Sequence, residues 1–188
     1  MSVTSTVIHR AQTRFVQASD VLRPFVGCFW IVTAERGATL RTVPDGTTSI
    51  SVELRGHSSS DWVLRGPLIR PQTRRFASPA ILVGIRLRPG VALLVTGEDA
   101  DSMVGRRVHL RGQAFRLLSS PEFQSLTPES LIDLLQRFLI DRLVNRSVHP
   151  IVAAAVREIE GAGGCPRVGE VADACGVSAR HLNRLMSR

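Results

Sequence analysis

Between residues 26 and 87, short runs of apolar residues alternate with clusters of glycine, proline, aspartate and serine. The runs are rich in β-branched and aromatic residues, and runs of this kind bounded by turn residues are typical of β-strands. The clearest turn is Pro44-Asp45-Gly46, because proline presets its first corner and glycine accepts a left-handed one. We expect strands at Val26–Thr33, Ala38–Val43, Thr48–Leu54, Trp62–Leu64 and Pro79–Leu87. This regular spacing favours a barrel or sandwich over βαβ units.

Further along the chain the spacing of apolar residues becomes helical. Pro128–Asn145 carries the longest such stripe, with Thr127 as a suitable cap and Pro128 as a suitable first residue. A second helix is expected at Ile151–Glu160, with Pro150 in its first turn. Shorter elements are expected as a helix at Val91–Thr96, a helical turn at Asp99–Val104 and a loop at Gly105–Leu110 that leads to Phe115–Leu118. The sequence therefore predicts an α+β protein whose strands precede its main helices.

The final segment, Val168–Arg188, predicts a helix, a turn and a second helix. Apolar residues of the first helix share one face, namely Val168, Val171, Ala172 and Cys175. Gly176 suits the left-handed position just after that helix. Ser178 can cap the next helix through its hydroxyl, and Val177 can pack on Leu182 as a hydrophobic staple.

The second helix of this segment has two opposed faces. Its apolar side holds Leu182, Leu185 and Met186, and its polar side holds Arg180, Asn183, Arg184 and Ser187. Arginine can donate a bidentate pair of hydrogen bonds to guanine, and asparagine can pair in the same way with adenine. These faces favour a DNA-reading helix-turn-helix, and the alternative is a helical hairpin with a solvated basic face.

The run G-E-V-A-D-A-C-G-V-S-A-R-H-L-N-R-L-M resembles the first helix-turn-helix of AraC/XylS-type transcription regulators. The matching positions are Ala172, Gly176, Ser178, Leu182, Arg184 and Met186. The resemblance implies DNA contacts from Ser178, Ala179, Arg180, Asn183, Arg184 and Ser187. That family joins two such motifs by a long helix, whereas this chain ends at Arg188, where the first recognition helix ends. The residues leave open a truncated product or a protein that works with half of the usual apparatus.

The N-terminal part resembles a sensor-like domain of unknown function that precedes the DNA-binding unit in some AraC-type regulators. Four motifs carry the likeness: L-x-P-F-V-x-x-F-W at Leu22–Trp30, V-P-D-G-T at Val43–Thr47, G-P at Gly66–Pro67 and G-I-R-L-R-P-G at Gly84–Gly90. The resemblance implies a cupin-like β-barrel or sandwich that holds a small-molecule effector.

Three residues are candidates for binding that effector. Trp30 lies in an apolar strand, where it can line a pocket or simply belong to the core. Arg86 and Arg88 share one face of the Pro79–Leu87 pattern, where they can meet an anionic ligand or an internal carboxylate. The alternative for both arginines is an outer, solvated face.

The helix at Pro128–Asn145 can bury its apolar stripe on its own barrel or against a second copy of the chain. In AraC-type regulators a helix at this place often makes the dimer, so we predict a homodimer through Leu131, Leu135, Phe138 and Leu139. The expected organisation is a β-rich sensor-like domain at 1–126, a linker and dimerisation helix at 127–147, and a partial DNA-binding domain at 148–188.

The formal net charge is +8 and the isoelectric point is about 11.3, which favours an anionic partner such as double-stranded DNA. The chain has no lysine, and a GC-rich bacterial genome would give this arginine bias without selection for binding. Its three cysteines, Cys28, Cys165 and Cys175, have neither a disulfide framework nor zinc-ligand spacing. No signal peptide or membrane-length apolar run is present, so we expect a soluble, cytoplasmic protein.

Enzymatic chemistry has no recognisable motif here. No G-x-S-x-G or Walker sequence is present, and the five histidines show no paired metal spacing. We therefore expect no catalytic residues, no metal and no cofactor. The sequence predicts a ligand-responsive, DNA-binding transcription regulator, with a truncated ligand-binding or dimerising module as the alternative.

Overall fold

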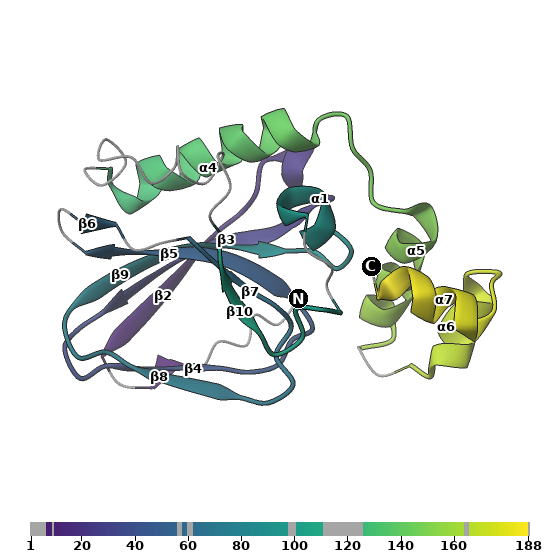
Figure 1. Cartoon of the computed structure of the whole chain (residues 1–188), viewed down its shortest axis with the longest axis horizontal. Helices are drawn as coiled ribbons and strands as arrows, with labels where there is room; N and C mark the ends of the chain where they lie inside the picture. Colours follow the sequence, from purple (N-terminus) through teal and green to yellow (C-terminus); the bar gives the residue numbers. More distant parts are fainter. Residues whose placement is uncertain are drawn as a thin grey trace.

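The computed structural model of the chain describes residues 7–8, 10–55, 58–59, 62–97, 101–110, 126–163 and 166–187. An antiparallel β unit comes first and most of the helices follow it, so the predicted α+β class is confirmed (Figure 1). Phe115–Leu118, Cys165 and Arg188 lie outside the described residues, as does part of the helical turn expected at Asp99–Val104.

The elements follow one another with clear bounds. The strands are β1 (Val7–Ile8), β2 (Ala11–Val16), β3 (Val26–Ala34), β4 (Thr39–Thr42), β5 (Thr48–Arg55), β6 (Ser58–Ser59), β7 (Val63–Arg65), β8 (Gln72–Arg75), β9 (Ala80–Leu87) and β10 (Arg107–His109). The helices are the short 3-10 turn η1 (Asp20–Leu22), α1 (Ala92–Thr96), α4 (Pro128–Leu143), α5 (Pro150–Gly161), α6 (Val168–Ala174) and α7 (Ala179–Met186).

All five predicted strands are present, as β3, β4, β5, β7 and β9. The loop expected at Gly105–Leu110 contains β10 instead, because the backbone of Arg107–His109 pairs with that of β7. The polar stretches of β2 and β8 also form strands, and each pairs along its length with a neighbouring strand. Backbone pairing with a neighbour therefore sets the conformation of these polar strands.

Two antiparallel sheets face each other. The seven-stranded sheet has the order β10-β7-β5-β9-β3-β2, with β6 paired to β5, and the three-stranded sheet has the order β1-β4-β8. The larger sheet begins at β10 and ends at β2 without closing on itself, so the closed cupin-like barrel is not confirmed. The arrangement is closer to the sandwich alternative, with α4 on one side of the large sheet and β4 and β8 on the other (Figure 1).

The main hydrophobic core lies between the large sheet and α4. Alternate residues of the central strands, such as Phe29, Ile50 and Ile85, are buried there. The stripe of α4 fills the other side of this core with Leu131, Ile132, Leu135, Leu139 and Leu143, all buried, while Phe138 is partly buried against it. Polar contacts reinforce the docking, since the backbone N–H of Ser19 donates to Oε1 of Gln136 at 3.0 Å.

This packing corrects the expected role of Leu131, Leu135, Phe138 and Leu139. Three of these side chains are at most 1% exposed and Phe138 packs on the same core, so they do not offer a surface to a second copy. The stripe takes the alternative use, burial on the chain's own sheet. The predicted start of α4 is confirmed, because Oγ1 of Thr127 accepts a hydrogen bond from the backbone of Ser130 at 3.2 Å and Pro128 follows it.

The segment just after β9 contacts α5. The guanidinium of Arg88 donates from Nε to the backbone oxygen of Arg23 at 2.8 Å, and its Nη1 lies 3.5 Å from Oε1 of Glu160 on α5. Gly90 lies against the same helix, since a Cβ there would be 2.8 Å from Cγ1 of Val152. No helix in the described ranges combines the length and apolar character needed to cross a membrane.

Candidate functional site

The helix-turn-helix predicted at the C-terminal end is present as α6 and α7. Gly176 has φ +66°, the left-handed conformation expected of it after α6. The hydroxyl of Ser178 accepts a hydrogen bond from the backbone of His181 at 3.2 Å, which confirms it as the cap of α7. At the start of α6, Oε2 of Glu170 accepts from the backbone of Arg167 at 3.0 Å. Local hydrogen bonds therefore fix where each of the two helices begins.

A small separate core holds these helices against α5. It consists of Ala155, Val171, Ala172 and Leu182, with Cys175, Val177 and Met186 packed around it. Val168 is 50% exposed, which corrects the expectation that it belongs to the apolar face of α6. The buried face of α6 begins at Val171, one turn later.

The outer face of α7 is polar and accessible. Ser178, Ala179, Arg180, Asn183, Arg184 and Ser187 are all exposed, as the predicted DNA-contacting set requires. No acidic residue lies within Ala179–Met186. Nη2 of Arg184 lies 3.3 Å from Nδ1 of His181, whereas the hydroxyl of Ser187 donates to the backbone oxygen of Asn183 at 3.0 Å. The face is thus cationic near its centre, and Ser187 is turned back to the helix.

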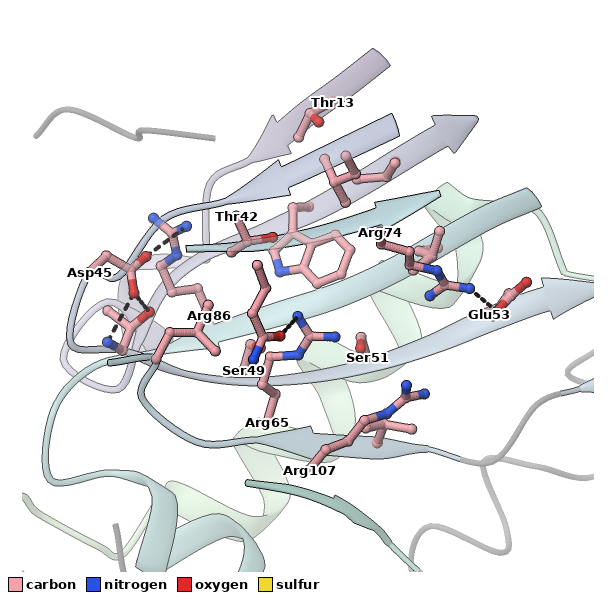
Figure 2. Close-up of a pocket in the computed structure, with 18 of the residues that line it drawn as sticks. Thr13, Thr42, Asp45, Ser49, Ser51, Glu53, Arg65, Arg74, Arg86 and Arg107 are labelled. Carbon is pink, nitrogen blue, oxygen red and sulfur yellow. Dashed lines mark hydrogen bonds and ion pairs between the residues drawn. The ribbon is translucent and has the colours of Figure 1, made fainter. Parts of the chain in front are cut away.

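A second candidate site lies between the two sheets. It is a pocket of about 460 Å³ lined by strands of both sheets, from β2 to β10. Strand register places Arg107 opposite Arg65, Arg65 opposite Ser49, and Ser49 opposite Arg86. Because directly paired residues point to the same face of a sheet, these side chains form one row across four strands. Figure 2 shows the three guanidinium groups around the cavity.

Two of the pocket's four arginines are neutralised by carboxylates. Nη2 of Arg74 lies 2.6 Å from Oε2 of Glu53, and Nη2 of Arg86 lies 3.0 Å from Oδ2 of Asp45 (Figure 2). Asp45 is itself fixed, since its Oδ1 accepts from the backbone and hydroxyl of Thr47 at 3.0 and 2.7 Å. The V-P-D-G-T and G-I-R motifs therefore meet through one ion pair.

The remaining two arginines have no carboxylate partner in the part of the chain that the structure describes. Arg65 donates from Nη1 to Oε1 of Gln72 at 3.4 Å, and no ion pair of Arg107 is found there. Burial lowers the pKa of Arg65, and the neighbouring Arg107 and Arg74 guanidinium groups lower it further. Four arginines and two carboxylates leave the pocket with two excess positive charges.

Apolar side chains line the part of the pocket over β2, β3 and β9, with one more from β4. Phe15, Trp30, Val32, Leu40 and Leu82 line it. The indole of Trp30 lies on the backbone of Gly84, because a Cβ at that glycine would be 2.1 Å from Cζ2 of the ring. Glycine in the middle of β9 thus lets a large aromatic ring lie flat beside the cavity.

Two of the three residues predicted to bind an effector line the pocket, and the third does not. Trp30 and Arg86 line the pocket, with Arg86 on its inner face and paired to Asp45. Arg88 lies outside it, at the contact with α5. The pattern did not indicate Arg74 or Arg107, because β8 and β10 are too polar to be recognised as strands. Arg65 was missed for another reason, since it is the last residue of β7 and follows directly after the predicted strand Trp62–Leu64.

The thiol of Cys28 lies beside this row of arginines without forming a metal site. Burial raises the pKa of Cys28, the Arg86 guanidinium lowers it, and the Asp45 carboxylate raises it. Within the described ranges, no cluster of histidine, cysteine, aspartate and glutamate is suited to hold a metal ion.

Comparison with known proteins gives one match. Residues 14–109 match the model of a protein family described as "Domain of unknown function (DUF6597)". The match begins in β2 and ends with β10, so it spans nearly all residues that line the pocket. No curated protein and no solved structure matches the chain.

Proposed function

The chain belongs to the DUF6597 family, whose description states no activity, and we propose that it is a DNA-binding transcription regulator responsive to a small molecule. In this proposal α7 reads the DNA, as the resemblance to AraC-type regulators implies, and the pocket between the sheets receives the effector. No catalytic step is assigned to any residue.

The exposed face of α7 carries the proposal. Arg180, Asn183 and Arg184 are solvent-accessible on a helix without acidic residues, and the opposite face is anchored by the buried Leu182. An α-helix of this kind fits the major groove, where arginine can pair with guanine and asparagine with adenine. Ala179 is small enough to contact a thymine methyl group.

A recognition helix such as α7 supplies limited affinity when it acts alone. One module buries a small interface on DNA, so phosphate contacts and salt concentration dominate its binding. Pairing of two copies would place two α7 helices on one DNA, and a homodimer is therefore part of the proposal. Because the stripe of α4 is buried, that pairing requires another surface.

The alternative function is a ligand-binding or dimerising module without specific DNA binding of its own. It is favoured by one observation, that the pocket lies almost entirely within residues 14–109, which match the family, whereas α7 lies outside that match. The two functions differ in whether binding depends on DNA sequence.

The experiment is fluorescence anisotropy of the chain on a fragment from upstream of its own gene and on a scrambled fragment, across salt concentrations. The test variant is Arg184→Ala, and the matched control is Arg137→Ala, which removes one exposed charge from α4. We expect Arg184→Ala to weaken binding to the native fragment by about tenfold to a hundredfold, the range of one bidentate base contact. Arg137→Ala should leave binding to the native fragment unchanged.

Equal binding to the native and scrambled fragments, lost at physiological salt, would contradict the proposal. Such a result would leave only sequence-independent phosphate attraction and would support the alternative module.

A further inference from the structure

We infer that the pocket between the two sheets binds a small organic oxyanion, with its charged group on Arg65 and Arg107 and its apolar body on Trp30. The inference rests on the effector-binding part of the proposed function and is independent of DNA binding. It specifies the chemical class of the effector, a carboxylate or phosphate attached to an apolar ring or chain.

The charges of the pocket favour an anionic ligand at the partly buried Arg65 and the exposed Arg107. Arg74 and Arg86 each have a carboxylate within 3.0 Å, so the excess charge is located at Arg65 and Arg107. These two residues are direct cross-strand partners, and like charges in that position destabilise a sheet. An anion placed between them would replace a repulsion by two attractions.

The state of Arg65 supports the same conclusion. Its pKa is lowered by burial and by the two neighbouring guanidinium groups, so the charged form is held in an unfavourable environment. Its one hydrogen bond, to Gln72, is long at 3.4 Å. A guanidinium with unused donors matches the two oxygens of a carboxylate or phosphate, to which it can donate in parallel.

Neighbouring polar groups extend the anion site. Ser49 lies between Arg65 and Arg86 in the row, and Ser51 lines the pocket two residues further along β5. Their hydroxyl groups can donate to an oxyanion that the arginines hold. The charged end of the ligand therefore lies over β5, β7 and β10.

The other end of the ligand contacts an apolar wall. That side is lined by Trp30, Phe15, Leu40 and Leu82. The ring of Trp30 lies directly against the backbone of Gly84, where a Cβ would displace it. A volume of about 460 Å³ is within the usual range for small-molecule sites. A bare inorganic ion would leave this wall uncovered, so the ligand has an apolar portion.

The experiment uses the full chain without DNA and four probes: benzoate, phenyl phosphate, inorganic phosphate and the neutral benzamide. Isothermal titration calorimetry gives affinity, and tryptophan fluorescence gives position, because Trp30 lines the pocket while Trp62 is 1% exposed in the core. We expect at least one aromatic anion to bind once per chain and quench Trp30. Benzamide and inorganic phosphate should each bind at least about tenfold more weakly, because benzamide has no negative charge and inorganic phosphate has no apolar group. The order of benzoate and phenyl phosphate distinguishes a carboxylate from a phosphate effector.

Two neighbouring substitutions locate the anion. Arg107→Gln should weaken the tighter aromatic anion by about tenfold to a hundredfold, the range of a charge-assisted hydrogen bond. Arg106→Gln removes the same charge from the preceding residue, which is exposed like Arg107 but does not line the pocket, and should leave affinity unchanged. Arg107→Gln should unfold at the same temperature or higher, because it removes a like-charge contact.

Three results would overturn the inference. They are binding of benzamide as tight as that of the anions, equal effects of the two substitutions, and absence of binding by both aromatic anions up to about 10 mM. Because these titrations contain no DNA, a failure of the DNA experiment with Arg184→Ala leaves their outcome unaffected.

Discussion

Substitution of Gly84 by alanine should displace Trp30 and destabilise the sheet. The new Cβ would lie 2.1, 2.3 and 2.7 Å from Cζ2, Cε2 and Cη2 of the Trp30 ring. Carbon atoms in contact are separated by about 3.5–4.0 Å, so the ring has to shift by about 1.5 Å. Overpacking of this kind costs about 1–3 kcal/mol.

Urea unfolding measures this cost directly. With a typical dependence of about 1–3 kcal/mol per molar, the midpoint of Gly84→Ala should fall by about 1 M. The displaced ring moves toward the pocket, where empty space lies beside it, so the emission of Trp30 should change while Trp62 stays buried. The matched control is Gly27→Ala on β3, whose Cβ would meet no atom closer than 3.6 Å and should change stability by less than about 0.5 kcal/mol.

A double-mutant cycle tests the stated cause. In a Trp30→Ala background the cost of Gly84→Ala should disappear, which gives a coupling of about 1–3 kcal/mol. An equal cost with and without the indole would refute the reasoning, because the loss would then arise from the backbone of β9.

The remaining predictions concern caps and the buried thiol. Thr127→Ala should lower the free energy of unfolding by about 1 kcal/mol, measured in urea, because Ser130 loses its partner at the start of α4; Ser147→Ala, an exposed hydroxyl outside any helix or strand, is the comparison, and equal losses would count against the cap. The raised pKa of Cys28 means that the folded state keeps this proton more firmly than the unfolded state. The protonated thiol therefore contributes fully to the free energy of unfolding below its ordinary pKa of 9.0, and this contribution is lost as the pH rises through the raised pKa of the folded state. Cys28→Ala should accordingly reduce the fall in the free energy of unfolding above pH 9.0. Iodoacetamide labelling followed by peptide mass spectrometry should modify the half-buried Cys175 before the buried Cys28, and the reverse order would refute this assignment of burial.

Local patterns were sufficient to predict the apolar strands and the caps of two helices, α4 and α7. β3, β5 and β9 carry enough β-branched and aromatic residues to be recognised, and Thr127 and Ser178 both cap the helices that they precede. The signals are local because each depends on residues within one element.

The pocket depends on contacts that no local pattern contains. Arg65 and Arg107 meet because β7 and β10 pair in one register, and β10 is too short and polar to be predicted as a strand. The stripe of α4 was recognised, but its spacing fits the chain's own sheet as well as a second copy. Only the three-dimensional arrangement shows that Leu135 and Leu139 complete the chain's own core.

The position of α4 also determines when this protein can fold during its synthesis. The family match ends at residue 109, whereas the core over the sheet is completed by Pro128–Leu143. Contacts such as that between Ser19 and Gln136 join residues 117 positions apart, and folding through such distant contacts is slow. A ribosome must therefore release α4 before the apolar side of the sheet is covered. Phe29, Ile50 and Ile85 can therefore be fully buried only after α4 has left the ribosome, and exposed apolar surface of this kind favours aggregation of a partly folded chain.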